Sequence, residues 1–598
     1  MIRINQLKLQ IPHTEEALEK KIQKTLHLKK GDSFTYRIHR QSLDARRKPE
    51  LFYVYTVDVT VSNENAILKH CKGNIQKVEE KHYQIPSHGT KTLNVRPVVI
   101  GSGPAGLFCA YLLALEGYRP LILERGACVE ERKKDVDRFW ETGVLDPSSN
   151  VQFGEGGAGT FSDGKLNTLV KDKTGRNRFV LETFVKFGAD EDILYAHKPH
   201  IGTDVLIDVV SQMRQEIISL GGEFCFHTQV TDVDLTSKTL KLVHLSENSA
   251  EEEVSAGAAV FAIGHSARDT FEMLYKHQIP MRAKSFAVGV RIEHPQTLID
   301  HSQYGRDRGN DLPAAAYKLT ENLDNGRGVY TFCMCPGGYV VNASSEEHRL
   351  AVNGMSYHDR AGENANSAVI VTVTPDDFGS DHPLAGISFQ RSLEEKAYQA
   401  GQGKVPVQRF GDFKEDQITT SYGMVHSCMK GASVFGDVRG IFPEEIAQSR
   451  TPLRIIRIFR LVVCCIHIVY ATCQTCIHNR QILIWKRNIH YQIRFVIIDQ
   501  FDQLIHIVCI NLGCRKNCFC LSFQLFCKCI TFFLCTACDT KFCEDLICLT
   551  TFLNCYTGYS SAADYKYSAH NSSPFLQQLY IYNILVTVQS QPSKCYAF

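Results

Sequence analysis

Residues 97–126 constrain the fold more than any other stretch of the chain. An apolar run at 97–100 is followed by Gly-Ser-Gly-Pro-Ala-Gly at 101–106, an apolar segment at 107–118 and a second apolar run that ends at Glu124. This spacing predicts a strand, a tight glycine turn, a helix and a second, parallel strand. That order is the βαβ unit that binds dinucleotides.

Each residue type in the glycine turn has a role in such a unit. Gly101 permits the tight turn, Gly103 lets the backbone approach a diphosphate, and Gly106 allows close helix–strand packing. The helix that opens at Pro104 and Ala105 offers free N–H groups and a partial positive charge to phosphates. The sequence therefore predicts an anion site at this helix N-terminus.

An acidic residue follows the second strand. Glu124 is expected to accept hydrogen bonds from ribose hydroxyls, and Arg125 beside it is expected to belong to the same site. A long apolar strand later ends in Ala-Ile-Gly at 262–264, after the strand that ends at Val230. A small residue and a glycine at a strand end are typical of FAD domains, so Gly264 and Val230 are expected near the adenosine half of FAD.

A second glycine-rich segment lies at 150–166. It has five glycines between Gly154 and Gly164, which lets the backbone pass close to a ligand. One interpretation is a loop that folds back over the cofactor, and the alternative is a flexible surface loop. The residues expected to line the flavin are Gly156, Gly157, Gly159 and Lys165.

No catalytic acid or base is identified; the candidates are His265, Asp163 and Lys165. The helix predicted from 203 to 218 has Thr203 as its expected N-cap.

Residues 1–90 predict a small α+β domain. Strand-like and helix-like patterns alternate in the order βαββαβ, which is typical of a ferredoxin-like fold. The middle of this segment is basic. A solvated surface is favoured over an RNA site or an acidic partner, because no motif of stacking aromatic residues accompanies the charge.

Beyond residue 96 the chain divides into further predicted segments. We expect a Rossmann-type FAD-binding domain over 96–280, a β-rich substrate domain over 281–400, and a return to the FAD domain over 401–449. Cys333 and Cys335 lie on a predicted strand with both sulfurs on one face. They are interpreted either as a redox pair, with one thiol near the flavin, or as two buried structural thiols.

Several long motifs, taken in order, resemble bacterial uncharacterised FAD-dependent dehydrogenases. They lie at 30–33, 42–46, 101–106, 150–166, 262–269, 289–295, 332–338 and 353–356, so the match covers about 1–449. The resemblance implies an FAD-dependent oxidoreductase of the two-dinucleotide-domain type with a ferredoxin-like N-terminal domain. Its partner is expected to be a small-molecule substrate or electron acceptor, with NAD(P)H as one candidate.

The composition changes abruptly near Ser449. Sixteen of the 23 cysteines follow residue 450, whereas 39 of the 41 glycines precede it. The family normally closes with a Gly-Glu-Gly-Ala-Gly element, which is missing here. An out-of-frame or unrelated tail over 450–598 explains these observations together. A metal domain built on the pairs Cys473/Cys476 and Cys535/Cys538 has ligand pairs too far apart, and the apolar runs are too short or interrupted for a membrane anchor.

The overall composition limits which classes of protein this chain can belong to. A length of 598 residues predicts several domains, and a formal net charge of +2 gives no general attraction for nucleic acid or for anionic membranes. The first residues form no apolar signal segment. A cytoplasmic protein without a metal site is therefore expected, which is either an active oxidoreductase, an inactive member of its family, or a non-catalytic nucleotide- or RNA-binding module.

Overall fold

The computed structural model describes residues 1–446, apart from 30, 71–72, 81, 91, 169, 171, 246–248, 324–325 and 444–445, and the backbone of 585–591. All of these residues belong to one compact unit, Met1–Cys465 with Asn583–Phe598. The interpretation of the remaining tail lies outside the described residues. Within the described part of the chain, no helix is both long and apolar enough to cross a membrane.

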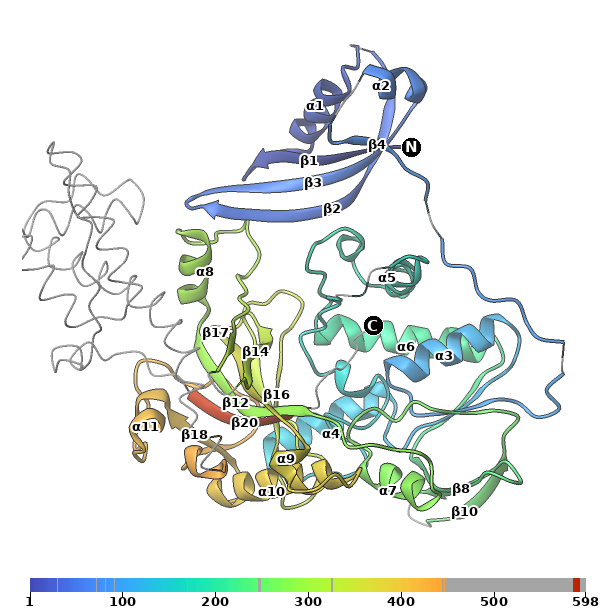
Figure 1. The fold of residues 1–598 in the computed structure, drawn as a ribbon, viewed down its shortest axis with the longest axis vertical. Coiled ribbons are helices and arrows are strands. Elements are labelled where there is room, and N and C mark those ends of the chain that lie inside the picture. Colours follow the sequence, from blue (N-terminus) through green and yellow to red (C-terminus); the bar gives the residue numbers. More distant parts are fainter. Residues whose placement is uncertain are drawn as a thin grey trace, which may run out of the picture. The chain divides into compact units, whose positions relative to one another are not determined.

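The first sheet is four-stranded and antiparallel, in the order β2-β3-β1-β4 (Figure 1). Its helices α1 and α2 occupy the two crossover positions, so the predicted ferredoxin-like arrangement is found. The core contains the inward residues of β1 and β3, among them Ile2, Ile4 and Val57, and the apolar face of α1. The elements are β1 Ile2–Gln10, α1 Glu15–Leu26, β2 Phe34–Arg47, β3 Glu50–Val61, α2 Glu64–His70 and β4 Ile75–Lys77.

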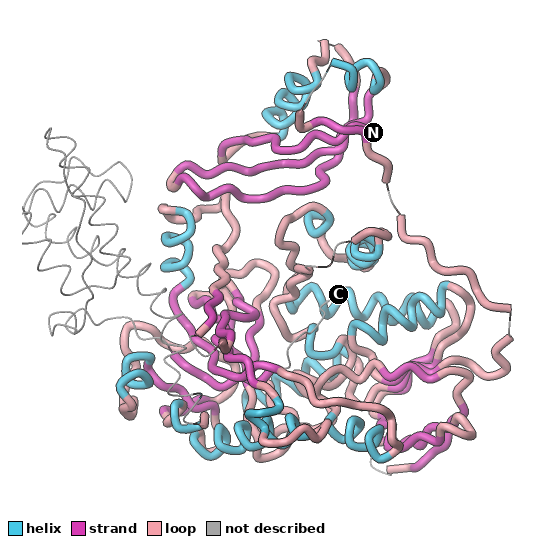
Figure 2. Tube along the Cα trace, viewed as in Figure 1, coloured by secondary structure: helices cyan, strands magenta, loops and turns pink. Residues whose placement is uncertain are grey.

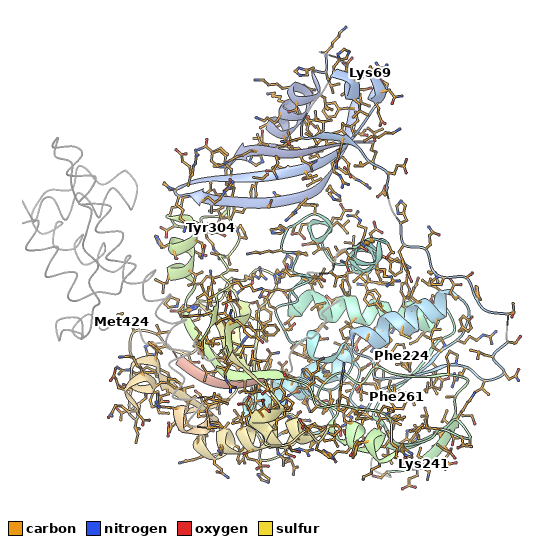
Figure 3. All side chains as sticks on the ribbon, viewed as in Figure 1. Lys69, Phe224, Lys241, Phe261, Tyr304 and Met424 are labelled. Carbon is orange, nitrogen blue, oxygen red and sulfur yellow. The ribbon has the colours of Figure 1, made fainter. Side chains whose placement is uncertain are left out.

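A second four-stranded sheet carries the glycine turn. It is parallel, in the order β11-β5-β6-β7, and Phe224 and Phe261 mark its two outer strands in Figure 3. The elements that form and cover it are β5 Val98–Ile100, α3 Pro104–Leu115, β6 Leu121–Leu123, α4 Val129–Thr142, α5 Arg176–Lys186, α6 Thr203–Ser219, β7 Glu223–Cys225, β8 Thr228–Asp234, β9 Thr239–His244, β10 Glu251–Ser255, β11 Ala259–Phe261 and α7 Arg268–Lys276.

Both faces of this parallel sheet are covered, as its apolar strands require. Val99 and Ile122 face α3, α5 and α6. Val98 and Ile100 face the small antiparallel sheet β10-β9-β8 and α7. Successive side chains of these three-residue strands thus point to opposite faces of the sheet. Layers on both faces give the Rossmann-type arrangement that the sequence predicted. The N-cap of α6 is Gly202 rather than Thr203, which is the first residue of the helix.

The largest sheet has seven strands in the order β13-β14-β17-β12-β20-β18-β19, and strands are drawn in magenta in Figure 2. Its central strands β12 and β17 are buried along nearly their whole length. The elements of this region are β12 Phe286–Pro295, α8 Gln296–Tyr304, β13 Thr320–Asn322, β14 Gly328–Cys335, β15 Tyr339–Asn342, β16 Val352–Met355, β17 Asn364–Val373, α9 Pro375–Phe378, α10 Ala385–Ala400, β18 Val405–Arg409, α11 Phe410–Glu415, β19 Ser433–Phe435 and β20 Leu585–Gln591.

Two features of this sheet differ from the sequence analysis. Residues 405–409 and 433–435, expected to return to the FAD domain, pair within the seven-stranded sheet instead. The physical reason is that β18 is buried over four of its five residues, which suits a central strand. In addition, β20 pairs antiparallel with β12 and with β18, although no strand was expected in that part of the chain.

The N-terminal sheet is attached to the large sheet by apolar contacts. Ile11 and Leu51 belong to the same buried cluster as Ile299 and Tyr304 of α8. The Lys48 ammonium also donates to the carbonyl oxygen of Ser302. The ferredoxin-like domain is therefore part of the packed structure of the described residues.

We predict that Leu51→Ala lowers the free energy of unfolding by about 2–5 kcal/mol, because it opens a cavity where the two sheets meet. Leu235→Ala is the control variant, because Leu235 is 53% exposed whereas Leu51 is 2% exposed. The midpoint of urea unfolding measures the difference. Equal midpoints for the two variants would contradict the packing described above.

Candidate functional site

The turn after β5 needs glycine at two positions for steric reasons. Gly101 has a φ of +95°, and a Cβ there would lie 2.6 Å from the carbonyl oxygen of Ala262. A Cβ on Gly106 would lie 1.9 Å from the carbonyl oxygen of Gly101. The close approach of β5, α3 and the end of β11 therefore depends on these two residues.

Gly103 has a different environment. It is the N-cap of α3 at a φ of −68°, and a Cβ there would touch only Gly157 Cα, at 3.7 Å. Pro104 begins the helix, no side chain among the described residues caps it, and its first turn contains no acidic residue. The N-terminal N–H groups of α3 are thus left for an anion, which is the charge that a helix N-terminus favours.

Glu124 is buried at the end of β6 and connects three turns. Its Oε2 accepts hydrogen bonds from the backbone N–H and the hydroxyl of Ser102, both at 2.8 Å. Its Oε1 accepts from the N–H groups of Gly126 at 3.0 Å and Gly154 at 3.2 Å. The carboxylate that the sequence assigned to a ribose therefore also fixes the glycine turn against the second glycine segment.

The second glycine segment lies directly against the first. The N–H of Gly156 donates to the carbonyl oxygen of Ser102 at 2.9 Å. Cβ atoms built on Gly157 and Gly159 would lie 3.1 Å from Gly103 Cα and 3.7 Å from Pro104 Cγ. The backbones of the two segments meet at the N-terminus of α3, which agrees with a loop that folds back toward the predicted phosphate site.

Arg132 of α4 holds this loop from inside. Its guanidinium is fully buried and donates to five backbone carbonyl groups, which belong to Asn150, Val151, Gly154, Glu155 and Gly157, at 2.6–3.3 Å. Burial lowers the pKa of Arg132 to about 10, so the side chain stays charged at neutral pH. A segment whose regular secondary structure is limited to the short 3₁₀ helix η1 Gly157–Gly159 thereby acquires a defined backbone path.

A buried ion pair connects the same loop to α6. Arg214 Nη1 lies 2.6 Å from Glu155 Oε2, which also accepts the N–H of Val129 at 2.8 Å. Arg214 Nη2 reaches Glu130 at 2.6 Å. Burial pushes the pKa of Glu155 upward and Arg214 acts against that shift; the 2.6 Å contact indicates an ion pair.

Asp163 anchors the far end of the loop. Its carboxylate accepts from Ser356 Oγ at 2.6 Å and Arg360 Nη2 at 2.5 Å, and Lys165 Nζ lies 3.1 Å away. Burial alone would raise the pKa of Asp163, but Lys165 and Arg360 hold it below its ordinary value. The hydroxyl of Thr203, the residue expected to cap α6, donates to the carbonyl oxygen of Ser162 at 2.7 Å. The loop is therefore fixed to both α6 and the β16 region.

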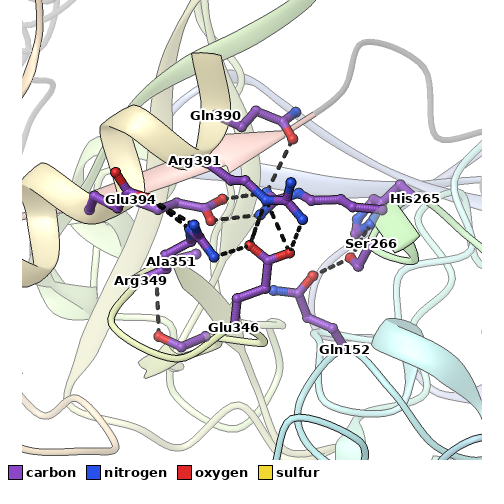
Figure 4. Close-up of polar contacts among 12 residues, drawn as sticks. Gln152, His265, Ser266, Glu346, Arg349, Ala351, Gln390, Arg391 and Glu394 are labelled. Atoms are coloured by element: carbon purple, nitrogen blue, oxygen red, sulfur yellow. Dashed lines mark hydrogen bonds and ion pairs between the residues drawn. The ribbon is translucent and has the colours of Figure 1, made fainter. Parts of the chain in front are cut away.

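The predicted catalytic candidates fall into two groups. Asp163 and Lys165 contact one another, and Lys165 Nζ also donates to the carbonyl oxygen of Met334. His265, after β11, instead contacts Ser266 Oγ at 2.6 Å, and Ser266 donates to Gln152 (Figure 4). His265 is exposed to solvent.

The remaining predicted residues differ in their surroundings. Arg125 lies 2.8 Å from Asp269 and above the ring of Phe153 at 4.6 Å. Gly264 has a φ of +67°, and a Cβ there would meet open space. Val230 is a core residue of the layer beneath β5 and β6.

A cavity of about 800 Å³ lies beside Arg125. Its walls include Phe153, Ser266 and Asp269, together with residues 345–349 and the side chains of Arg268, Glu395, Tyr398 and Gln399. Figure 4 shows the charged network that forms one side, in which Glu346 accepts from Arg268, Arg349 and Arg391 at 2.8–2.9 Å. Burial opposes ionisation, but these arginines, Arg391 foremost, lower the pKa of Glu346 to about 2.

Sequence analysis did not identify Arg132, Arg214 or this network as site residues. Each is a charged residue on a helix or loop whose partners are far away in the chain. The fully buried guanidinium of Arg132 follows from its position on the inner face of α4, a helix with mostly charged outer positions.

We predict that Arg132→Met lowers the free energy of unfolding by about 3 kcal/mol or more, because five carbonyl groups lose their buried donor. Arg138→Met on the same helix is the control, since the Arg138 side chain is 57% exposed. Urea unfolding of both variants measures the difference. A variant at position 132 as stable as the control would disprove the role of this guanidinium.

We also predict that Asp163→Asn costs about 3–5 kcal/mol at neutral pH, because Lys165 and Arg360 lose a buried counter-charge. The pKa of Asp163 is lowered in the folded state, so the stabilisation is present above the unfolded value of about 3.9 and is lost as pH falls through the folded value. The gap to wild type should narrow below about pH 4. Asp381→Asn, at an exposed position, is the control, and a gap independent of pH would refute the prediction.

Comparison with known proteins gives three family matches. Residues 285–452 match the C-terminal domain-like family of FAD-dependent proteins, residues 99–129 match the NAD(P)-binding Rossmann-like domain, and residues 1–60 match a domain of unknown function. An uncharacterised protein of Clostridium beijerinckii is 45% identical over 453 residues, which are 75% of this chain and 84% of that relative.

Solved structures give weaker similarities. A flavoprotein/dehydrogenase from Cytophaga hutchinsonii is 14% identical with a TM-score of 0.25, over 48% of this chain and 57% of that one. Glycerol-3-phosphate dehydrogenase from Bacillus halodurans, complexed with FAD, is 11% identical with a TM-score of 0.24, over 50% and 53%. This chain thus spans little more than half the length of those two proteins.

The match over 99–129 contains the glycine turn, and the match over 285–452 contains every strand of the large sheet except β20. The glycine turn, the Rossmann-type sheet and the match over 285–452 agree with one another. The chain belongs to the family of FAD-dependent oxidoreductases, and its cofactor is FAD.

Proposed function

We propose that this chain transfers a hydride between a small-molecule substrate and bound FAD, with NAD(P)H as a candidate electron partner. The observation that carries the proposal is the uncapped N-terminus of α3 at Gly103, which faces the second glycine segment. An open helix N-terminus without acidic residues fits the diphosphate of FAD. Bound FAD supplies the capacity to accept or donate an electron pair, and the protein binds and orients it and excludes water.

Residues on both sides of Gly103 would hold the cofactor. We assign the N–H groups at the start of α3 to the diphosphate, with Pro104 and Ala105 forming the first turn. Gly156, Gly157 and Gly159 would cover it from the opposite side, and Lys165 would lie toward the flavin. Arg125, Gly264 and Val230 would border the adenosine half.

Glu124 is proposed to bind the ribose, under a constraint that its surroundings set. Its two oxygens already accept four hydrogen bonds from Ser102, Gly126 and Gly154. A carboxylate offers about four lone-pair positions, so a ribose hydroxyl must replace one of these donors. Movement of the Gly154 N–H, whose 3.2 Å bond is the longest of the four, would free a position.

The three acid/base candidates are not equally suited to proton transfer. Asp163 and Lys165 neutralise each other, which supports a positioning role for the pair. His265 is exposed and has a neighbouring hydroxyl, and a neutral imidazole there can accept a proton. We therefore favour His265 as the acid/base candidate.

We further propose that the sequence after about residue 449 is out of frame or unrelated to the family. The support is the loss of glycine and the excess of cysteine there, together with a family match that ends at residue 452 and a relative matched over 84% of its length. Sequencing the DNA around codon 449 and translating all frames tests this. A Gly-Glu-Gly-Ala-Gly element in another frame is expected; its absence from every frame would contradict the proposal.

We predict that the purified full chain takes up FAD and that Gly103→Ala lowers its FAD affinity at least about tenfold, or about 1.4 kcal/mol. A Cβ at Gly103 meets the protein only at an ordinary contact distance of 3.7 Å, so the methyl group should obstruct the ligand and leave the fold intact. Titration with FAD, followed by quenching of flavin fluorescence, measures the affinity.

Gly89→Ala is the matched control, because a Cβ at Gly89 has nothing within 4 Å. Both variants should unfold at the same urea concentration as wild type. A chain that binds no FAD, or equal affinities for the two folded variants, would count against the assigned site.

A further inference from the structure

The segment Cys333-Met334-Cys335 interrupts the regular pairing of β14 with β17. Phe332 pairs with Ala368 and Cys335 pairs with Asn366, so three steps along β14 correspond to two along β17. The extra residue forms a β-bulge, and Cys333 has a φ of +45°. A bulge re-aims side chains locally, so the two thiols do not follow the regular strand pattern that the sequence suggested.

Two cations bind the backbone of this bulge. Arg291 of β12, which is fully buried, donates through Nη2 to the carbonyl oxygen of Cys333 at 2.6 Å and lies 3.7 Å from Cys335 Sγ. Lys165 of the glycine segment donates to the carbonyl oxygen of Met334. Asp163, whose charge acts in the opposite sense on Cys333, is paired with Lys165 and Arg360. The thiols therefore lie in a positively charged environment.

A buried amide faces the same position. Asn366, opposite Cys335, is 0% exposed, and among the described residues neither of its side-chain polar atoms has a hydrogen-bond partner. A Cβ on Gly354 would lie 2.4 Å from both Arg291 Nη2 and Asn366 Oδ1. Polar groups thus converge on this pair from β12 and β17, where an apolar core would be expected for two merely structural thiols.

The two thiols are unequal. The Cys335 thiol, with Arg291 and Lys165, lowers the pKa of Cys333, against the effect of burial and of Asp163. Burial and the neighbouring Cys333 raise the pKa of Cys335. Cys428 provides a contrast within the same domain, because burial and Glu293, 3.6 Å away, raise its pKa to about 12.

We propose that Cys333 and Cys335 form a redox-active dithiol that reduces small-molecule disulfides. Cys333 is the attacking thiolate and Cys335 the resolving thiol. This inference rests on the proposed function in one respect: the pair needs two electrons for each turnover, and a bound reduced flavin would supply them. The contact of Lys165 with Met334 connects the bulge to the glycine segment assigned to that flavin.

The exchange is balanced in two steps. The Cys333 thiolate attacks one sulfur of the substrate, the substrate S–S bond breaks, and one half leaves as a thiolate that takes a proton. Cys335 then loses its proton to water and attacks Cys333 Sγ, which releases the second half as a thiol. The sum converts one external disulfide to two thiols and the protein dithiol to a disulfide.

The charges favour this order of events. Once Cys333 is bonded to the first half of the substrate, its negative charge no longer opposes ionisation of Cys335. Arg291 and Lys165 then act on Cys335 alone. The same two cations thus serve both steps in turn.

Limited alkylation of the full chain with iodoacetamide at about pH 6, followed by peptide mass mapping, tests the first thiol. Cys333 should be alkylated at least about tenfold faster than Cys428 or Cys109. Burial raises the thiol pKa of both of these comparison cysteines. Lys165→Met should reduce this ratio, and Lys173→Met at an exposed position should not. Equal rates at Cys333 and Cys428 would overturn the proposal.

Oxidised glutathione tests the second step. The wild-type peptide that contains both residues should become two hydrogens lighter and carry no glutathione, whereas Cys335→Ser should retain one glutathione on Cys333. A persistent adduct on the wild type, or no reaction, would overturn the proposal. Neither readout requires FAD, so the two proposals can fail separately. Unreactive thiols in a chain that binds FAD would refute only the dithiol proposal. Reactive thiols in a chain that binds no FAD would refute only the proposed function.

Discussion

The candidate site depends on the buried guanidinium of Arg132. The regular structure of the second glycine segment is limited to the short 3₁₀ helix η1 Gly157–Gly159. Several of its backbone carbonyl groups lie in the interior, where an unpaired polar group is costly. Arg132 supplies donors to five of these carbonyls from a single side chain. The planar, multiply donating guanidinium suits this task in a way that an ammonium group does not.

The opposite end of that segment is fixed by charge of the other sign. Asp163 accepts from Ser356 and Arg360, residues that follow β16 in the large-sheet region, and contacts Lys165 of its own loop. The segment therefore passes from the Rossmann-type sheet, where Arg132 holds it, to the region of the large sheet. Contacts thus run from the loop beside Gly103 to the bulge at residues 333–335, through Lys165 and the carbonyl oxygen of Met334.

Sequence patterns predicted the features that depend on neighbours in the chain. The steric need for glycine at 101 and 106, the βαββαβ order of the first domain and the parallel strands 98–100 and 121–123 all have local signals. The roles of Arg132, Asp163 and Thr203 have no local signal in the sequence, because their partners are distant in the chain, as Arg360 is from Asp163. The bulge at Cys333 is set by pairing with β17, so an alternating pattern alone suggested a regular strand. Pairing of β18 in the large sheet is likewise a tertiary outcome.

The bulge also explains why its two cations lie where they do. A non-glycine residue at a φ of +45° carries a conformational cost on the order of 1–3 kcal/mol, which persists only when surrounding interactions impose it. Arg291 and Lys165 bind the carbonyl groups of Cys333 and Met334, so they stabilise this backbone conformation through the same charges that act on the thiols. Loss of either cation would relax the bulge and weaken the thiolate together. The geometry of the loop and the chemistry of the cysteines are therefore one property of the structure.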